Sequence, residues 1–208
     1  MSADPQFWNK LAERYAAKPV DDPEAFERKI AITKSLMKPD HVIADIGCGT
    51  GSLALRLAPH AAHVHGLDLS DEMLRIANGK AEGVDNVTFH CTAFDDSIPL
   101  EPGSLDGVCA YSILHLLDDR QASLKLLFDL LKPGGFFVSS TVSLGNTWIP
   151  YRPLLAVMKA FGKAPDVYIV NSAQLAEEAA AAGFVDWTEH DVGAEGIITF
   201  ATARKPAD

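Results

Sequence analysis

The sequence has few cysteines, no long apolar run and no excess of positive charge. Its three cysteines, Cys48, Cys91 and Cys109, are odd in number and far apart, which favours reduced thiols in a cytoplasm over a disulfide framework. No stretch approaches the roughly 18 consecutive apolar residues of a membrane span. Residues 1–15 interleave acids with bases and lack the apolar core of a signal peptide. We therefore expect a cytoplasmic protein without a membrane span.

The formal net charge is −10, and lysine and arginine are scattered along the chain. Enzymes of nucleic acids usually carry a basic stripe that neutralises phosphates, so DNA or RNA is not an expected partner. With 208 residues, 48% of them hydrophobic, the chain suits one globular domain over residues 1–208. The sequence contains no internal repeat and no low-complexity tract.

Two helices are predicted in the first 38 residues. Asp4 with Pro5, and Asp22 with Pro23, each form a cap followed by a first-turn proline. Apolar residues then recur at helical spacing, and Pro39 ends the second pattern.

From residue 42 the pattern alternates between strand and helix. The five strand-like runs are Val42–Ile46, Val64–Leu67, Val87–His90, Gly107–Ala110 and Phe136–Thr141. The clearest helical pattern covers residues 120–135, with Leu124, Leu127, Phe128 and Leu131 on one face and with Pro133 and two glycines at its end. Apolar strands that alternate with helices predict a mostly parallel sheet covered on both faces.

The pattern changes after Gly183. Residues 184–192 and 196–204 are strand-like, and Gly193 to Gly196 join them. So short a connection makes a hairpin, so one of the two strands must run antiparallel to the rest. The predicted fold is a Rossmann-like α/β domain with a seven-stranded mixed sheet and helices on both faces.

A glycine-rich loop follows the first of these strands. Asp45, Gly47, Gly49 and Gly51 lie where that strand turns into the predicted helix 52–58. Glycine permits a positive φ and lets a ligand approach the backbone, while free N–H groups at a helix start favour an anion. The alternative is an ordinary tight connection in an α/β protein.

The ligand is indicated by the spacing of these residues. Asp68 ends the next strand, where an acid accepts hydrogen bonds from a ribose. The glycines run G-x-G-x-G, and Ser52 stands where a dinucleotide fingerprint has its third glycine. Asp45 would repel a pyrophosphate and attract an ammonium. S-adenosylmethionine offers an ammonium, a carboxylate and a ribose, and therefore suits this loop better.

Four stretches carry a family resemblance: "VIADIGCGTG", "GLDLS", "SLDGVCAYSILHLL" and "LLKPGGFFVSSTV". In this order they resemble the motifs of class I S-adenosylmethionine-dependent methyltransferases, in particular the small single-domain branch with ubiquinone/menaquinone-type methyltransferases. "FWNKLAERYAAKPV" resembles the N-terminal helix of that branch. The resemblance covers residues 6–141 and the topology of the closing hairpin. It is specific for the family but not for the substrate.

The resemblance implies a cofactor site. The methionine end would lie on Asp45, Gly47, Gly49 and Gly51, with Cys48 inside the loop, and the ribose on Asp68. Leu69 and Met73 would line the adenine, with Ala93 and Phe94 on its other side. Tyr111 and Ser112 would neighbour the cofactor through their backbone, with Tyr15 over it. Many members carry an acid after the third strand that contacts the adenine amino group. Here Thr92 stands in that place and Asp95 follows, and both remain alternatives.

The acceptor side is less defined. The resemblance makes residues 1–38 a helical lid and residues 143–172 the acceptor region, with a short helix at 153–161. Trp8, His115, Trp148 and Tyr151 are the candidates for substrate contact. His115 follows the fourth strand and is a weak candidate for a general base, the alternative being a packed structural histidine. No metal is expected, since His60, His63 and His65 lack a cysteine or free acid at ligand spacing.

These features predict a methyltransferase, EC 2.1.1.-, that converts S-adenosylmethionine to S-adenosylhomocysteine while methylating a small-molecule acceptor, with apolar and aromatic compounds as candidates. Two alternatives remain: a non-catalytic S-adenosylmethionine-binding protein and, opposed by the glycine spacing, an NAD(P)-dependent oxidoreductase. The oligomeric state is open, and a homodimer is one alternative.

Overall fold

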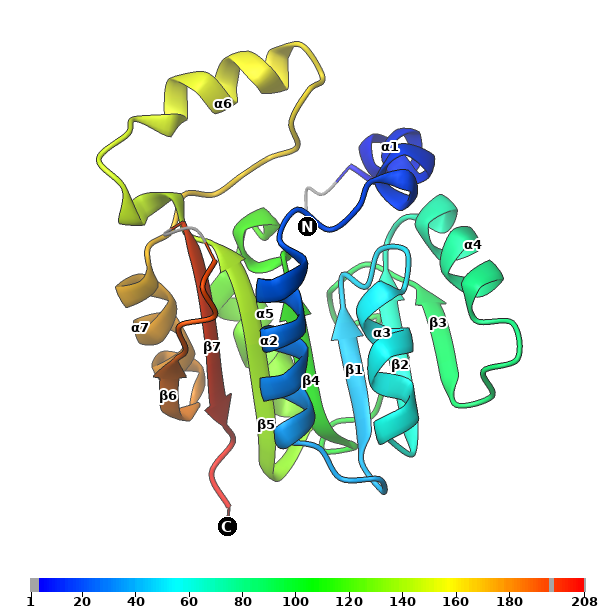
Figure 1. The fold of residues 1–208 in the computed structure, drawn as a ribbon. Helices are drawn as coiled ribbons and strands as arrows, with labels where there is room; N and C mark the ends of the chain where they lie inside the picture. Colours follow the sequence, from blue (N-terminus) through cyan, green and yellow to red (C-terminus); the bar gives the residue numbers. More distant parts are fainter. Residues whose placement is uncertain (1–3, 195–196, 208) are drawn as a thin grey trace.

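The computed structural model describes residues 4–194 and 197–207. Figure 1 shows one twisted sheet with helices on both faces. The strand order is β3-β2-β1-β4-β5-β7-β6. The strands are β1 Val42–Ile46, β2 His63–Asp68, β3 Val87–Cys91, β4 Leu105–Tyr111, β5 Leu131–Val142, β6 Val185–Glu189 and β7 Ile198–Arg204. The predicted seven-stranded Rossmann-like sheet is confirmed.

Seven α-helices are found in the described residues: α1 Pro5–Ala17, α2 Pro23–Ser35, α3 Ser52–Leu57, α4 Asp71–Lys80, α5 Arg120–Leu130, α6 Tyr151–Ala160 and α7 Ser172–Ala182. Short 3₁₀ turns occur at η1 Ala58–His60, η2 Leu114–Leu116 and η3 Leu144–Asn146. In the described part of the chain, no helix is long and apolar enough to cross a membrane.

The two N-terminal helices begin as their caps predict. Asp4 accepts a hydrogen bond from the backbone N–H of Gln6 at 2.9 Å, and Asp22 accepts one from Ala25 at 2.9 Å. The second helix ends at Ser35, earlier than the apolar pattern indicates, because the chain turns at Leu36.

Successive side chains of each central strand point to opposite faces of the sheet, and this divides the core into two layers. Ile43, on one face of β1, packs with residues of α2 and α3, whereas Ala44, on the other face, packs with residues of α5 and α7. A central strand with both faces buried must be apolar throughout, which is why β1 reads as a continuous apolar run up to Asp45.

The prediction that Pro133 and the glycines end the fifth helix is wrong. This helix, α5, already ends at Leu130, and Leu131 pairs with Leu105 in the sheet. Phe136 pairs with Gly107, so three extra residues bulge from the start of β5. Proline and glycine are accommodated there because a bulge needs fewer ladder hydrogen bonds.

One further boundary differs from the predicted one. The helix after the glycine loop, α3, ends at Leu57, and the chain continues as the 3₁₀ turn η1. In the closing hairpin, β7 is the antiparallel strand, since it pairs antiparallel with both β5 and β6. Gly193 lies in the predicted connection, and Gly196 lies outside the described residues.

The parallel strands end at one edge of the sheet, where function is expected in an open α/β fold. Asp45 pairs with Gly66 in register, and Asp68 pairs with Cys91. In Figure 1, both α1 and α6 lie above this edge of the sheet, with α6 on the left and α1 on the right.

An ion pair joins the two helices that cover one face of the sheet. Arg120 on α5 donates two hydrogen bonds to Glu178 on α7, at 2.7 and 2.9 Å, with side-chain exposures of 13% and 19%. Glu178→Gln should lower the free energy of unfolding by about 1–3 kcal/mol, because it leaves a largely buried guanidinium without its charge partner. Urea denaturation measures this loss. Glu177→Gln, at an exposed position on the same helix, is the matched control. Equal stability of the two variants would contradict the assigned contribution.

Candidate active site

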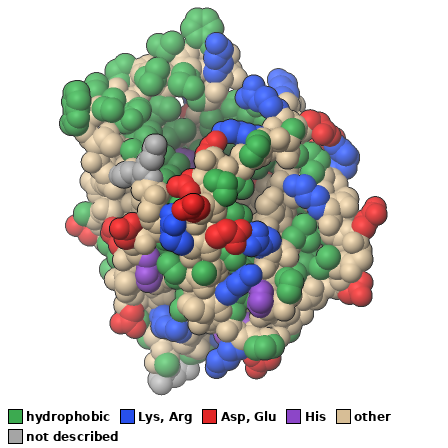
Figure 2. Space-filling model, in the orientation of Figure 1, with side chains coloured by type: hydrophobic (Ala, Val, Ile, Leu, Met, Phe, Trp, Pro, Cys, Tyr) green, Lys and Arg blue, Asp and Glu red, His purple; other side chains and the backbone are tan. Residues whose placement is uncertain are grey.

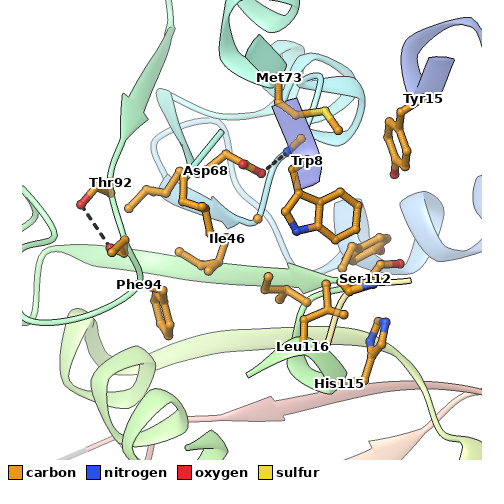
Figure 3. Close-up of a pocket in the computed structure, with 18 of the residues that line it drawn as sticks. Trp8, Tyr15, Ile46, Asp68, Met73, Thr92, Phe94, Ser112, His115 and Leu116 are labelled. Carbon is orange, nitrogen blue, oxygen red and sulfur yellow. Dashed lines mark hydrogen bonds between the residues drawn. The ribbon is translucent and has the colours of Figure 1, made fainter. Parts of the chain in front are cut away.

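A cavity of about 380 Å³ lies at the carboxyl edge of the sheet. Figure 3 shows its walls, which come from α1, the strand ends of β1, β2, β3 and β4, and the segment 165–167. The sequence-predicted residues that line it are Trp8, Tyr15, Gly47, Gly49, Asp68, Leu69, Met73, Thr92, Ala93, Phe94, Tyr111 and His115. Residues separated by more than one hundred positions are thus brought to one site.

The glycine loop forms one wall of this cavity. Gly47 and Gly49 have φ angles of +69° and +53°, which favour glycine. A Cβ on Gly47 would lie 3.0 Å from Cδ1 of Ile113. Gly51 does not line the cavity. It caps α3 with a φ of +74°, and a Cβ there would lie 2.8 Å from the ring of Phe89. Gly47 and Gly49 therefore line the cavity without a side chain, whereas Gly51 allows close packing against Phe89.

Asp68 is held in a fixed orientation at the end of β2. Its Oδ2 accepts a hydrogen bond from the N–H of Gly49 at 2.9 Å, and its Oδ1 accepts one from Ser70 at 2.9 Å. Burial raises the pKa of Asp68, and these two amides oppose the shift. Each carboxylate oxygen keeps lone pairs that a hydroxyl donor in the cavity can use.

Asp45 lies deeper than the cavity wall. It is 1% exposed, and its Oδ2 has no hydrogen-bond partner among the described residues. Burial raises its pKa to about 8. The charge of Asp68 adds to the shift, and the N–H of Ala54 opposes it. The group is therefore mostly neutral at pH 7. A buried carboxyl without a partner gains most from a nearby cation.

The two candidates for the adenine contact lie in different places. Thr92 lines the cavity, and its Oγ1 donates to the carbonyl of Ala93 at 3.1 Å. Asp95 lies outside the cavity wall, is exposed and accepts a hydrogen bond from Oγ of Ser97 at 2.6 Å. Thr92 is therefore the better placed of the two.

His115 occupies the opposite wall, in the turn η2. It is 8% exposed, and its Nδ1 has no partner in the described part of the chain. Burial lowers its pKa to about 4, with a smaller contribution from the positive charge of Arg120. A neutral imidazole with an unused nitrogen in a cavity wall can accept a proton.

Tyr111 and Ser112 form the end of β4 beside the cavity. Thr33 donates its hydroxyl proton to the carbonyl of Lys29, so Tyr111 must be the donor in its 2.8 Å contact with Thr33. Ser112 has a φ of +57°, which is strained for a residue with a side chain. Its N–H bonds the carbonyl of Ser140 at 2.7 Å, which holds the strained turn in place.

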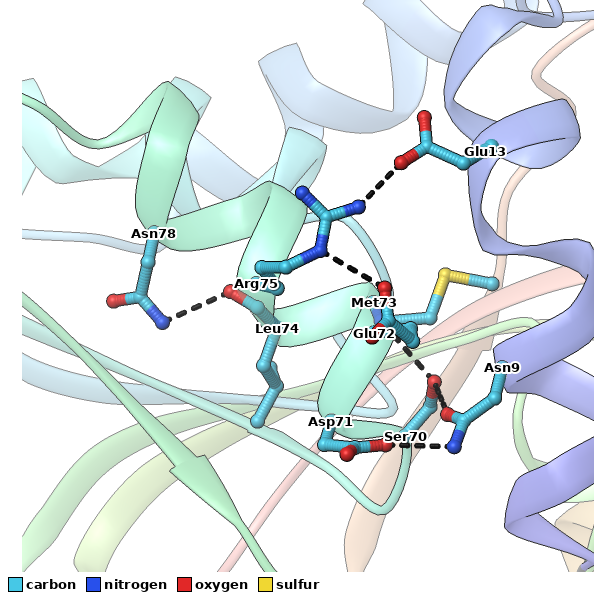
Figure 4. Close-up of polar contacts among 9 residues, drawn as sticks. All are labelled: Asn9, Glu13, Ser70, Asp71, Glu72, Met73, Leu74, Arg75 and Asn78. Carbon is cyan, nitrogen blue, oxygen red and sulfur yellow. Dashed lines mark hydrogen bonds and ion pairs between the residues drawn. The ribbon is translucent and has the colours of Figure 1, made fainter.

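The helix α1 covers the cavity with Trp8 and Tyr15. Figure 4 shows its polar contacts with α4. Oγ of Ser70 donates to Asn9 at 2.5 Å, and Nδ2 of Asn9 donates to Asp71 at 2.6 Å. Because the N–H of Ser70 also bonds Asp68, the cover and the acid are linked through one residue.

A second contact holds α1 one turn further along. Arg75 on α4 pairs with Glu13 on α1 and with Glu72 on its own helix. All three side chains are about half exposed or more, so the pair contributes little stability by itself.

Some predicted residues are not brought into the cavity. Trp148 is 92% exposed, and neither it nor Tyr151 lines the wall. The helix predicted at 153–161 is present as α6, which begins two residues earlier. No residue of α6 lines the cavity, whereas Pro165 and Val167, in the segment that follows it, do. Cys48 is buried behind the loop, and burial raises the pKa of its thiol.

Six apolar residues line the cavity although the sequence analysis gave them no role: Ile46, Leu67, Ile113, Leu116, Pro165 and Val167. Ile46 and Leu67 precede the loop and the acid directly, so position at a strand end is a usable signal. Pro165 and Val167 carry no such signal, because their place depends on how the chain returns from α6.

Histidines gather on β2 and β3. Nδ1 of His65 lies 3.0 Å from Nε2 of His90, and the rings of His63 and His65 are 4.6 Å apart. Burial lowers the pKa of His65 to about 4, with further contributions from His63 and His90. No group of three His, Cys, Asp or Glu residues that could hold a metal ion occurs in the described ranges.

Residues 43–135 match the family model of a methyltransferase domain. The chain is 32% identical over 103 residues to ubiquinone biosynthesis O-methyltransferases from Xylella fastidiosa (strain 9a5c) and Chromobacterium violaceum. The match covers 49% of this chain, 42% of the first relative and 44% of the second. The chain therefore spans less than half the length of these curated relatives.

Solved structures resemble the whole fold. A possible histamine N-methyltransferase from Thermotoga maritima has a TM-score of 0.72 at 19% identity, with 96% of this chain and 98% of that one covered. Phosphoethanolamine N-methyltransferase 2 of Haemonchus contortus, bound to S-adenosylmethionine, has a TM-score of 0.73 at 21% identity and covers 95% and 56%. The [4+2]-cyclase SpnF reaches 0.76 at 19% identity and covers 98% and 95%.

Residues 43–135 are therefore similar to a methyltransferase domain, and the strand order is that of the class I S-adenosylmethionine-dependent methyltransferase fold. The cofactor of this class is S-adenosylmethionine. The site fits it, since the unpartnered oxygen of buried Asp45 suits an ammonium and the two glycines leave the loop backbone open to a ligand. A neighbour described as a cyclase shows that the fold alone does not decide the reaction.

Asp45→Asn should stabilise the ligand-free protein at alkaline pH. The folded pKa of about 8 lies above the unfolded value, so the folded state holds the proton longer and wild-type stability falls as pH rises from 5 to 8. Three pH units at 1.4 kcal/mol each give an upper bound of about 4 kcal/mol for this loss.

Thermal unfolding between pH 5 and 8 measures the effect, with Asp40→Asn at an exposed position as control. The Asp45 variant should show a flatter pH dependence than wild type and the control. An unchanged slope would show that Asp45 is ionised in the free protein.

Proposed function

We propose that the protein transfers the methyl group of S-adenosylmethionine to a hydroxyl oxygen of a small aromatic acceptor. The observation that carries the proposal is the pair of acids, buried Asp45 and cavity-lining Asp68, joined by the glycine loop at one end of the cavity. The names of the curated relatives support oxygen as the accepting atom.

Each end of the cofactor has a matching group in this arrangement. Asp45 offers its unpartnered Oδ2 to the ammonium, and Asp68 offers its oxygens to the ribose hydroxyls. Leu69, Met73 and Phe94 supply apolar surface for the adenine, with Thr92 beside its amino group. Cys48 and Gly51 support the loop from behind and from the start of α3.

The bound cofactor would supply a methyl group on a sulfonium sulfur, which is already activated toward nucleophiles. The chain then has to hold the acceptor in line, exclude water and remove one proton. Trp8 and Tyr15 cover the cavity from α1, and Ile113 and Leu116 give its far wall an apolar surface. His115, neutral at pH 7, is the group placed to accept the hydroxyl proton.

The proposal also covers the organisation of the whole chain. Residues 1–208 act as one domain, in which residues 1–38 cover the cavity and residues 143–172 form the acceptor region. Because Trp148 and Tyr151 do not line the cavity, they would contact the acceptor outside it. Free buried thiols at Cys48 and Cys109 support work in a reducing cytoplasm. The acceptor is a small molecule rather than a nucleic acid, given the charge of −10.

The test is transfer of a labelled methyl group from S-adenosylmethionine to catechol. We expect labelled methoxyphenol, with calorimetric binding of S-adenosylmethionine and no binding of NAD. Asp68→Ala should weaken cofactor binding by about 1.5–3 kcal/mol, the value of hydrogen bonds to a charged group, while Asp85→Ala, at an exposed turn position, should not.

Two outcomes would contradict the proposal. Binding of S-adenosylmethionine without methylation of catechols or other phenols would favour a non-catalytic binding protein. Binding of NAD would favour an oxidoreductase.

His115→Gln should lower kcat for a phenolic acceptor by about 100-fold, the usual contribution of a positioned base. Because the pKa of His115 is lowered to about 4, kcat of the wild type should not change with an inflection near 6.5. A pH profile from 5.5 to 8 measures this, with His60→Gln at an exposed position as control. If kcat of the wild type showed an inflection near 6.5 that the His115 variant lacks, the imidazole of His115 would be solvated and its pKa would not be lowered.

A further inference from the structure

The segment before and including α6 exposes its apolar side chains to solvent. Residues 147–163, here called the α6 arm, contain no buried residue within the helix. Trp148 is 92% exposed and Phe161 is 75% exposed, and Leu154 and Val157 are more than half exposed. Figure 2 shows these hydrophobic side chains gathered at the end of the molecule where Figure 1 places α6. A contiguous exposed apolar surface of this kind marks an interaction site.

The helix has two distinct faces. Leu154, Val157 and Phe161, spaced three and four residues apart, lie on the exposed face. Arg152, Leu155, Ala156 and Lys159 line a groove of about 470 Å³ between α6 and the body. The side of the helix that faces the body is thus mixed, whereas the side that carries Leu154, Val157 and Phe161 is apolar and exposed.

The charge of the arm is opposite to that of the chain. No aspartate or glutamate occurs between Asp129 and Asp166, although the chain has 28 acids and a net charge of −10. The arm carries Arg152, Lys159 and Lys163. Lys159 pairs with Asp166, and the structure gives Arg152 and Lys163 no ion pair among the described residues. Within the arm, the exposed apolar side chains are accompanied by cations and by no acid, although Asp118 and Asp166 line the groove beneath it, and this composition suits an anionic interface.

A second copy of the chain fits this surface poorly. In a symmetric dimer the arm would meet itself and bring like charges together. The helix has 10 residues, about 15 Å at 1.5 Å per residue, which is short for the roughly 800 Å² per partner of a stable interface. A flat, fluid surface imposes neither requirement.

We propose that the α6 arm docks the protein on the surface of a bilayer containing anionic lipids. The helix lies in the interface, with Trp148, Leu154, Val157 and Phe161 among the acyl chains and with Arg152 and Lys163 at headgroup level. Pro165 and Val167 line both the groove and the cofactor cavity, so docking brings the cavity close to the bilayer. If the proposed methyl transfer holds, its acceptor is then a phenol dissolved in the membrane.

Vesicle flotation of the full chain tests docking without any need for turnover. The probes are vesicles of phosphatidylcholine alone and of phosphatidylcholine with about one third phosphatidylglycerol. Wild type should bind the anionic vesicles and leave them in high salt, because exposed charges are screened. Trp148→Gln with Phe161→Gln should reduce binding at least about tenfold, while Val20→Gln, another exposed apolar position, should not.

The charge contribution has its own variant. Arg152→Gln with Lys163→Gln should lower binding to anionic vesicles by about fivefold for each charge, and Lys38→Gln, an exposed cation outside the arm, should leave it unchanged. Sedimentation velocity should show the same oligomeric state for wild type and the Trp148, Phe161 double variant.

Three outcomes would overturn docking: no binding of wild type to anionic vesicles, equal binding of wild type and the apolar double variant, or a dimer that this variant alone abolishes. Methylation of water-soluble catechol without vesicles tests the proposed function separately. Failure of membrane docking and failure of methyl transfer can therefore be told apart.

Discussion

Two carboxyl groups at neighbouring strand ends constrain the whole site. Asp45, the penultimate residue of β1, is buried and has one oxygen without a partner among the described residues. Asp68 accepts hydrogen bonds from the N–H groups of Gly49 and Ser70. Burial and mutual repulsion disfavour ionising both. The fold therefore holds one acid in an unfavourable environment. In our account Asp45 is mostly protonated in the free protein at pH 7, and the cofactor ammonium lowers its pKa, so that cofactor binding is coupled to release of its proton.

The two sides of the cavity are built differently. On the cofactor side, Ser70 caps α4, bonds Asp68 and bonds Asn9 of the covering helix, so the ribose position and the cover form one hydrogen-bonded unit. On the acceptor side, α6 buries no residue and contributes to the wall only through the chain that follows it. In the function we propose, a hydrogen-bonded network would place the cofactor, whereas the acceptor would meet a surface to which α6 itself contributes no residue.

Most of the cofactor side could be predicted from the sequence. The order of strand, glycine loop, helix and strand requires Asp45 and Asp68 to meet at one sheet edge, because parallel strands end together. The caps at Asp4 and Asp22 likewise act locally. The wall formed by Pro165 and Val167 could not be predicted, since it depends on the path of thirty residues without a strong pattern. The position of Trp148 could not be predicted for the same reason, because an aromatic residue in a sequence does not reveal whether it faces a cavity or solvent.

The most direct test of the account is proton release when cofactor binds at pH 7. Calorimetric titration with S-adenosylhomocysteine in two buffers of different ionisation enthalpy gives this number. A neutral Asp45 that ionises beside the ammonium predicts release of about one proton per ligand, and almost none in Asp45→Asn. Tight binding of wild type without proton release would contradict the account, because it would mean that Asp45 is already ionised or takes no part in binding.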